Sequence, residues 1–189
     1  MAKRTKLTPS LKKKAKNIEL LIMDVDGVLT PGYIVLDESG AEMKFFDVHD
    51  GFGLALWKKA GLKTAIITAG NTKAVMKRAE YLKVDKVCQN ASNKLKTYNI
   101  LKEEFALGDE QICFIGDDLI DLPVLKKAGF SCCVSNAHKD ALPFAHYVSR
   151  NKGGRGAVRE IIDIILKAKG LWDKVTSDYF NGSLDEVSF

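Results

Sequence analysis

Residues 19–27 read Glu-Leu-Leu-Ile-Met-Asp-Val-Asp-Gly, an apolar run of four residues that ends in two aspartates and a glycine. A short, continuous apolar run predicts a strand that is buried on both faces, as in a parallel sheet. Asp24 and Asp26 stand two positions apart, so on an extended chain both carboxylates point to the same side. Gly27 permits a sharp turn directly after them. This stretch therefore predicts a core strand over 19–26 whose carboxyl end is acidic.

After one excursion, the rest of the chain alternates between strand-like and helix-like segments. The excursion covers 33–46, where two β-rich runs flank the turn-forming cluster Asp-Glu-Ser-Gly at 37–40 and predict a hairpin. The expected strands are 63–68, 86–88, 111–115, 130–134 and 147–148, and the expected helices are 51–60, 72–82, 93–105, 119–127 and 157–169. Alternation of this kind implies right-handed crossovers. We therefore expect a doubly wound, mainly parallel α/β sheet with helices on both faces.

The length of 189 residues fits one domain of ordinary size. Apolar residues at helical spacing within 7–18 predict that part of the amino-terminal arm docks as a short amphipathic helix. The carboxyl-terminal stretch shows no clear periodicity. The expected division is a basic arm or helix over 1–18, an α/β domain over 19–169 and a tail over 170–189.

The net charge of +5 comes from the amino-terminal arm, because residues 1–18 hold seven basic residues and no acidic one. The rest of the chain has slightly more acidic than basic residues. No aromatic residue interrupts the arm to stack on bases, so we interpret it as solvated and expect no nucleic-acid partner. Attachment of the arm to an anionic surface stays open as an alternative.

Four cysteines without a C-x-x-C pair, Cys88, Cys113, Cys132 and Cys133, indicate free thiols in a reducing compartment. Apolar runs are only a few residues long, well below the roughly 18 that a membrane span needs. The apolar region after the lysine-rich start is also too short for a signal peptide. We expect a cytoplasmic protein with no membrane partner.

Polar side chains gather at the predicted strand ends, where ligands bind in open α/β sheets. Several carboxylates at one edge repel each other unless a cation lies among them. Because the candidate ligands are hard oxygen donors without histidine or cysteine, we expect Mg²⁺. The residues at this edge are Asp24, Asp26, Thr68, Lys94, Asp117, Asp118 and Asp121.

This set of residue types predicts phosphoryl transfer. Thr68 and a backbone amide after it, at Ala69, can bind a phosphate, and Lys94 can neutralise its charge. Asp24 is the expected nucleophile, and Asp26 the acid that protonates the leaving oxygen and then deprotonates water.

The last acidic run is open to a second interpretation, because aspartate also caps helices well. Adjacent residues point apart, which favours Asp117 on the metal while Asp118 caps the following helix. Asp121, one helical turn later, faces the same side as Asp117 and is expected to orient Lys94.

The stretch Asp-Val-Asp-Gly-Val-Leu-Thr at 24–30 resembles the first motif of the haloacid dehalogenase superfamily. Thr68, Lys94 and the stretch 116–121 follow in the order of the other three motifs. The resemblance implies that the nucleophile and the acid/base are the two aspartates of the first motif, and that the threonine and lysine bind the phosphoryl group. It further implies Mg²⁺ held by Asp24, the backbone carbonyl of Asp26, and Asp117.

Over roughly 15–166 the chain is similar, more narrowly, to the 3-deoxy-D-manno-octulosonate 8-phosphate phosphatases. The resemblance implies hydrolysis of that sugar acid phosphate through an aspartyl-phosphate, in lipopolysaccharide precursor synthesis. It also implies a homotetramer whose hairpins build a central barrel, with no large cap domain. The gaps between motifs agree, since neither the 41 residues from Asp26 to Thr68 nor the 25 from Thr68 to Lys94 fit a full cap. The matching stretches are 15–18, 24–30, 49–51, 93–95, 116–121 and 153–160.

The same resemblance implies substrate contacts by His49, Asp50, Gly51, Arg78 and Arg155. Arg78 is suited to a bidentate contact with a substrate carboxylate, and Arg155 to the site of an adjacent subunit. His49 is equally consistent with a role as a structural hydrogen-bonding residue.

One departure from the family pattern leaves the substrate open. Where the family commonly has Thr-Gly-Arg, this chain has Thr-Ala-Gly-Asn at 68–71, so Gly70 replaces an arginine. A sialic-type nine-carbon sugar acid 9-phosphate, or another small phosphomonoester, is the alternative substrate. A phosphate-sensing binding module without catalysis is the alternative of another class, although both aspartates of the first motif are present.

Overall fold

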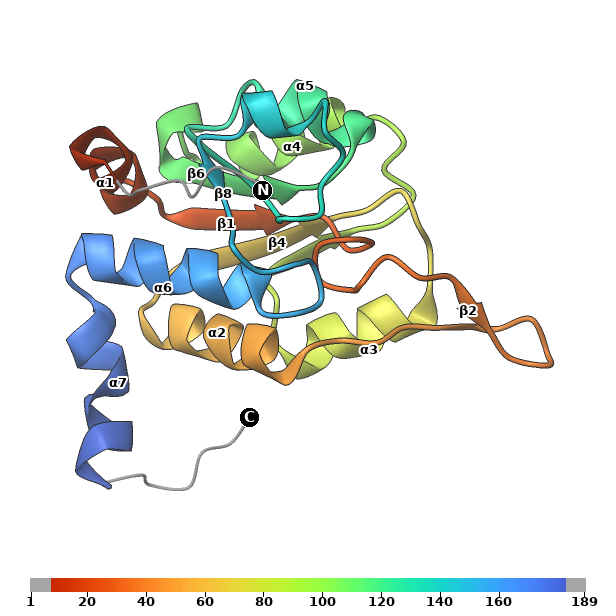
Figure 1. The fold of residues 1–189 in the computed structure, drawn as a ribbon, viewed down its shortest axis with the longest axis horizontal. Helices are drawn as coiled ribbons and strands as arrows, with labels where there is room; N and C mark the ends of the chain where they lie inside the picture. Colours follow the sequence, from red (N-terminus) through yellow and green to blue (C-terminus); the bar gives the residue numbers. More distant parts are fainter. Residues whose placement is uncertain (1–7, 183–189) are drawn as a thin grey trace.

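Six parallel strands form the central sheet of the computed structural model, which describes residues 8–182. Their order across the sheet is β5-β4-β1-β6-β7-β8, so the strand order reverses around β1. The predicted doubly wound parallel α/β fold is therefore confirmed (Figure 1). The strands are β1 Leu20–Met23, β4 Lys63–Ile67, β5 Lys86–Cys88, β6 Ile112–Gly116, β7 Phe130–Cys133 and β8 Tyr147–Val148.

The central strand, β1, is buried along its whole length, as its continuous apolar run predicts. It pairs with β4 on one side and with β6 on the other, and Met23 lies opposite Ile66 and Ile115. Because all three strands run parallel, their carboxyl ends meet at one edge. This edge receives the polar residues that follow each strand.

Helices cover both faces of the sheet (Figure 1). On one face, α4 Lys94–Glu104 and α5 Leu122–Leu125 enclose a core that contains Tyr98 and Phe114. On the other face, α2 Val48–Lys59, α3 Lys73–Tyr81 and α6 Ala157–Lys169 enclose a core around Trp57 and Ile161. The helix predicted in the amino-terminal arm is present as α1 Pro9–Lys16 and packs against α6. Residues 1–7 of that arm lie outside the described residues.

The regular elements between β1 and α2 are the two strands of the predicted hairpin, β2 Val35–Leu36 and β3 Glu42–Met43. Its paired strands are shorter than the expected runs and project from the body of the molecule (Figure 1). No larger domain is inserted at this point. Within residues 8–182 the chain also forms three short 3₁₀ helices: η1 Asp109–Gln111, η2 Leu119–Asp121 and η3 Leu142–Phe144.

The helix predicted over 119–127 is wrong in its extent. The chain forms the 3₁₀ turn η2 and then only one turn of α-helix, α5. The reason is the carboxylate of Asp121, which accepts the N–H groups of Asp117 and Asp118 and so folds the start of the segment into a tight turn.

The sequence predicts a tail over 170–189 without indicating its secondary structure, and in the structure Trp172–Asn181 of this stretch forms helix α7. Val175 is fully buried, and the Tyr179 ring packs edge-on against Phe52 of α2 at 5.2 Å between centroids. The spacing of Trp172, Val175 and Tyr179 is helical, so the signal was present but short. Residues 183–189 lie outside the described part of the chain.

Two sequence expectations concern features spread over the whole chain. All four cysteines are free, as expected. Among residues 8–182, none of the helices has the length and apolar character that a membrane span requires.

Candidate active site

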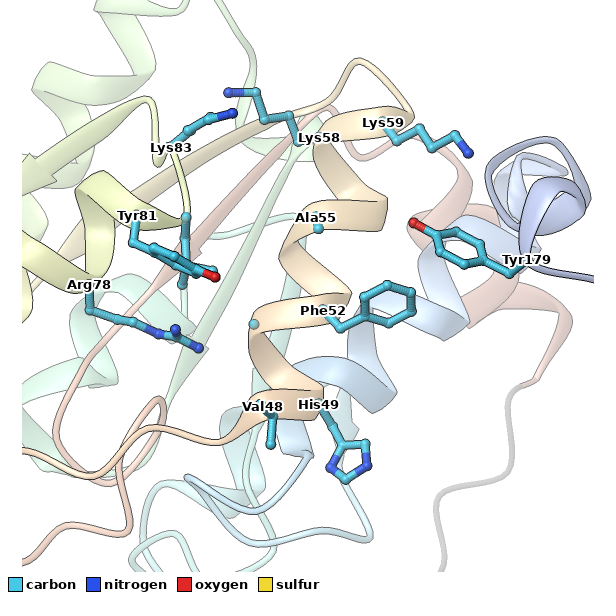
Figure 2. Close-up of a pocket in the computed structure, with 12 residues that line it drawn as sticks. Val48, His49, Phe52, Ala55, Lys58, Lys59, Arg78, Tyr81, Lys83 and Tyr179 are labelled. Atoms are coloured by element: carbon cyan, nitrogen blue, oxygen red, sulfur yellow. The ribbon is translucent and has the colours of Figure 1, made fainter. Parts of the chain in front are cut away.

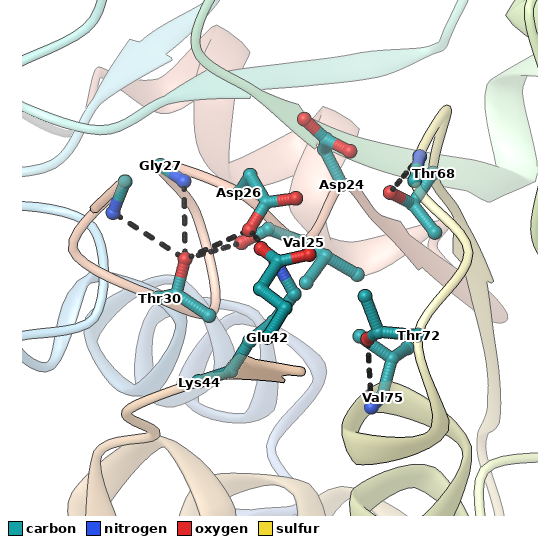
Figure 3. A network of polar contacts seen from close by, with 12 residues as sticks. Asp24, Val25, Asp26, Gly27, Thr30, Glu42, Lys44, Thr68, Thr72 and Val75 are labelled. Carbon is teal, nitrogen blue, oxygen red and sulfur yellow. Dashed lines mark hydrogen bonds and ion pairs between the residues drawn. The ribbon is translucent and has the colours of Figure 1, made fainter. Parts of the chain in front are cut away.

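The two aspartates of the first motif lie on the turn that follows β1 (Figure 3). Asp24 is buried, and its backbone N–H donates to the carbonyl of Ile115 at 3.0 Å, which ties the turn to β6. Asp26 is different, since 45% of its side chain is exposed. The strand geometry therefore ends before these residues, and the two carboxylates occupy distinct environments, one dry and one open to solvent.

A cluster of three carboxylates forms where β1 and β6 end. Ligand oxygens of Asp24, Asp117 and Asp121 all lie within 4.8 Å of one another. Burial raises the pKa of Asp24 to about 6; the Lys94 charge opposes this shift and the Asp121 charge adds to it. Burial, followed by the charges of Asp24 and Asp121, raises the pKa of Asp117 to about 7. Carboxylates that resist ionisation in this way gain stability from a bound cation, and an all-oxygen donor set suits Mg²⁺.

The backbone at Gly27 brings Asp117 close to the first motif. Gly27 has φ of +84°, and a Cβ atom there would overlap the Oδ2 atom of Asp117. On its other side, a Cβ atom at Gly153 would overlap the carbonyl oxygen of Gly27. The turn that carries Asp26 therefore packs closely against the Asp117 carboxylate on one side and against the glycine-rich turn of residues 152–156 on the other. A metal ion bound by residues of both the first and the last motif requires the Asp117 carboxylate to lie close to this turn, as it does here.

Asp121 and Asp118 have separate tasks. Asp121 is fully buried and accepts from Lys94 Nζ at 2.7 Å and from the N–H groups of Asp117 and Asp118 at 2.9 and 3.2 Å. Its two oxygens therefore already have donors, and its position orients Lys94. Asp118 is exposed and accepts from the N–H of Leu119 at 2.7 Å, as a cap. Asp118 is therefore a helix-capping residue, whereas Asp117 and Asp121 belong to the carboxylate cluster of the site.

The predicted phosphate-binding residues gather beside Asp24. Lys94 opens α4, is buried, and lies 2.9 Å from Asp24 Oδ1. Burial by itself lowers its pKa, but the charges of Asp24 and Asp121 outweigh that effect and raise the pKa above its usual value. Lys94 is therefore a fixed positive charge at the strand ends. Thr68 is buried at the end of β4, and its hydroxyl accepts from the N–H of Gly70 at 3.1 Å, while Ala69 is exposed between them.

Sequence analysis missed one residue at this site, Lys44. Its Nζ atom lies 2.6 Å from Asp26 Oδ1 and 2.6 Å from Glu42 Oε1 (Figure 3). The residue follows β3 of the hairpin, where alternating charged positions normally indicate a solvated face. No local pattern could have shown that this lysine turns toward the first motif.

Three of the predicted substrate-binding residues lie away from the aspartates of the first motif. His49, Gly51 and Arg78 line a cavity of about 600 Å³ between α2, α3 and α7 (Figure 2). Gly51 leaves room for the Arg78 guanidinium, which faces the rings of Phe46 and Tyr81 at 5.7 and 5.6 Å from their centroids. Their expected contact with substrate stays a prediction, because none of Asp24, Asp26 and Lys94 lines this cavity.

The remaining two predicted substrate-binding residues, Arg155 and Asp50, lie in different surroundings. Arg155 is exposed and lines a second hollow together with Pro31 and Tyr33, next to the turn that carries the first motif. Asp50 is buried, and its carboxylate accepts the backbone N–H groups of Gly156 and Arg159 at 3.2 and 2.8 Å. It caps α6, and nothing in this geometry supports a contact between Asp50 and substrate.

Comparison with known proteins agrees with this geometry. A family model for haloacid dehalogenase-like hydrolases matches residues 58–162. The 3-deoxy-D-manno-octulosonate 8-phosphate phosphatase of Escherichia coli K12 is 45% identical over 161 residues, which cover 85% of this chain and 86% of that protein. The corresponding phosphatase of Salmonella typhimurium is 43% identical and covers 89% of each chain.

Solved structures give the same assignment. The crystal structure of the Yersinia pestis 3-deoxy-D-manno-octulosonate 8-phosphate phosphatase has a TM-score of 0.86 and 43% identity, covering 87% of this chain and 89% of that one. The Moraxella catarrhalis phosphatase, solved with magnesium ion, phosphate ion and KDO, has a TM-score of 0.87 and 36% identity, covering 89% and 97%. The chain therefore belongs to the haloacid dehalogenase-like hydrolases and, within them, to the family of the 3-deoxy-D-manno-octulosonate 8-phosphate phosphatases.

Proposed function

We propose that this protein is a Mg²⁺-dependent phosphatase that hydrolyses 3-deoxy-D-manno-octulosonate 8-phosphate to the free sugar acid and phosphate. The observation that carries the proposal is the buried Lys94, held between Asp24 and Asp121 at the ends of β1 and β6, beside Asp117. A buried cation next to a carboxylate cluster suits a phosphoryl group better than a neutral substrate. The related Moraxella structure, which contains magnesium, phosphate and KDO, supports both the cofactor and the substrate.

In the proposed reaction, a carboxylate oxygen of Asp24 attacks phosphorus and the bond from phosphorus to the sugar oxygen breaks. Asp26 gives its proton to the leaving sugar oxygen, then takes a proton from the water that hydrolyses the aspartyl-phosphate. Lys94, the Thr68 hydroxyl and the backbone amide of Ala69 hold the phosphoryl oxygens. Bound Mg²⁺, held by Asp24, Asp117 and the backbone carbonyl of Asp26, would supply charge neutralisation for the transferring group.

The substitution at Gly70 leaves space rather than a new contact. A Cβ atom at this position would lie 3.5 Å from Thr68 Oγ1 and 3.6 Å from Asp26 Oδ2, which are ordinary contact distances. The backbone therefore does not require glycine, and the missing arginine enlarges the space beside the acid/base. A nine-carbon sialic-type 9-phosphate stays the alternative substrate.

We further propose that the protein works as a homotetramer in the cytoplasm, in lipopolysaccharide precursor synthesis. Three features support assembly. The hairpin exposes large apolar side chains, with Ile34 81% exposed, and three predicted substrate-binding residues, His49, Gly51 and Arg78, line a cavity away from the catalytic aspartates of their own chain. The Nε atom of Arg78 is buried and has no hydrogen-bond partner within residues 8–182, as expected for a group that a neighbouring copy or its substrate completes.

The test is phosphate release with and without Mg²⁺ from the octulosonate 8-phosphate, sialic-type 9-phosphates and simple sugar phosphates. We expect the highest kcat/KM on the octulosonate, no turnover after chelation, and a loss of about 10⁴-fold or more in Asp24→Asn, since the nucleophile is removed. Asp173→Asn, on the exposed start of α7, is the matched control that keeps wild-type rates. Highest kcat/KM on a nine-carbon substrate would replace the substrate assignment, and absence of turnover on every compound would favour a phosphate-sensing module.

A further inference from the structure

The hairpin reaches the first motif through one side chain, Lys44. Only 3% of this side chain is exposed, although the hairpin around it projects from the molecule. Its Nζ atom lies 2.6 Å from Asp26 Oδ1, and Glu42, on β3, accepts from the same nitrogen at 2.6 Å. A lysine that is withdrawn from water and satisfied by two carboxylates has one orientation, so it fixes whatever it contacts.

The two oxygens of Asp26 have different surroundings. Oδ1 is contacted by Lys44 and also lies 3.3 Å from the hydroxyl of Thr30. Oδ2 points the other way, toward the turn after β4, where a Cβ atom at Gly70 would lie 3.6 Å from it. That turn carries the Thr68 hydroxyl, which we assign to phosphate binding. The oxygen left free is therefore the one that faces the phosphate site.

From this arrangement we propose that Lys44 is a positioning residue: it anchors Asp26 Oδ1 so that Oδ2 meets the leaving oxygen of the substrate. The proposal rests on the phosphatase function stated above. It assigns to the hairpin a second task besides assembly, because the hairpin then holds the acid/base of its own chain in place.

A positioning role predicts that the importance of Lys44 depends on the leaving group. Departure of a sugar alkoxide needs a proton from Asp26, whereas 4-nitrophenolate leaves without one. If Lys44 instead attracted the phosphate by charge, both kinds of substrate would lose affinity equally. The parameter to compare is kcat/KM, which covers only the steps up to the departure of the leaving group.

The experiment measures kcat and KM of wild type, Lys44→Met and Lys44→Arg on the best sugar phosphate of the panel and on 4-nitrophenyl phosphate. For Lys44→Met we expect kcat/KM on the sugar phosphate to fall about 100-fold, mostly in kcat, because misplacing a catalytic group has effects of this order. On 4-nitrophenyl phosphate it should change little. Lys44→Arg keeps a charged donor to Oδ1 and should restore part of the loss on the sugar phosphate only.

Controls separate this effect from folding and from the proposed function itself. Lys96→Met, on the exposed side of α4, should keep wild-type values on both substrates. Molar mass and melting temperature of each variant show whether fold and assembly are retained; if Lys44→Met loses them, Glu42→Gln, which frees Lys44 from its second partner, should show the same selective loss at smaller size. Equal loss on both substrates, a rise confined to KM, or no loss would overturn the proposal. A wild type inactive on both would contradict the phosphatase function instead.

Discussion

At the residue scale, Gly27 shows how a missing side chain builds the site. Its φ of +84° lies in the left-handed region that favours glycine, and both of its neighbours in space approach within contact of its backbone. Asp117 lies on one side and Gly153 on the other. The absence of a Cβ atom at Gly27 therefore allows Asp117, in the last motif, to lie close to the backbone of the first motif.

We expect Gly27→Ala to lower both stability and metal affinity, because the methyl group adds left-handed strain and displaces Asp117. The strain alone is about 1–2 kcal/mol, and displacing Asp117 should raise the Mg²⁺ concentration for half-maximal phosphate release. Gly61→Ala is the matched control: Gly61 has φ of +80° with no atom within 4 Å of its Cβ position, so it carries the strain without the displacement. Gly27→Ala should lose at least as much melting temperature as Gly61→Ala, and only Gly27→Ala should need more Mg²⁺. A wild-type Mg²⁺ requirement in Gly27→Ala would contradict this account of the site.

At the scale of elements, Asp50 joins the starts of two helices. Asp47 caps α2, and Asp50, in the first turn of that helix, caps α6 across the interface. The N-cap residue of helix α6 is Gly156, which has no side chain to cap its own helix. Burial raises the pKa of Asp50 to about 6; the backbone N–H of Arg159 opposes the shift, and the Asp47 charge adds to it. The stability of the packing of α2 against α6 is therefore coupled to the protonation of Asp50.

The sign of this linkage follows from the raised pKa. Between about pH 4 and pH 6 the folded protein keeps a proton on Asp50 that the unfolded chain has released, so the Asp50 contribution to the free energy of unfolding falls as pH rises. The size of the fall is on the order of 3 kcal/mol. Urea unfolding of wild type and Asp50→Asn at fixed protein concentration should give a difference that changes across this window and is flat above about pH 7. Asp173→Asn should follow the wild-type profile, and a constant difference for Asp50→Asn would refute the linkage.

At the scale of the whole molecule, exposed apolar side chains concentrate on and around the hairpin. Tyr33, Ile34, Leu36 and Phe45 are each at least 60% exposed, on a two-stranded element that packs little against its own chain. A hairpin of this size is marginally stable alone. Its apolar surface therefore favours burial against other copies, which is the assembly proposed above.

Introducing a charge into this surface should separate the copies. Ile34→Glu removes about 2 kcal/mol of apolar burial per copy and adds a charge to be desolvated, so light scattering should report a mass below four chains. Activity on the sugar phosphate should fall at the same time, if neighbouring copies complete each site. Ile100→Glu, at an exposed position on α4, is the control that keeps mass and activity. A wild type that is monomeric at assay concentrations would rule out the tetramer.

The sequence by itself determined the order of strands and helices and the edge of the sheet at which the candidate site lies. The reason is geometric: buried strands in a parallel sheet have continuous apolar runs, and their carboxyl ends meet, so Asp24, Thr68 and Asp117 converge whatever the loops do. The helices that began and ended as predicted, such as α6, have long amphipathic patterns. Where the pattern was short, as in α7, the sequence left the secondary structure open.

Only the tertiary structure decided which partners the charged side chains take. Lys44 contacts Asp26 across 18 positions and Asp50 contacts Arg159 across 109, and neither contact has a local signature. Both depend on how a loop or a helix end approaches another element, which a one-dimensional pattern does not encode. The position of Arg78, in a cavity away from Asp24, was decided in the same way. Periodicity reports which side of an element is buried, whereas the direction of a polar side chain follows from the donors and acceptors that folding brings to it.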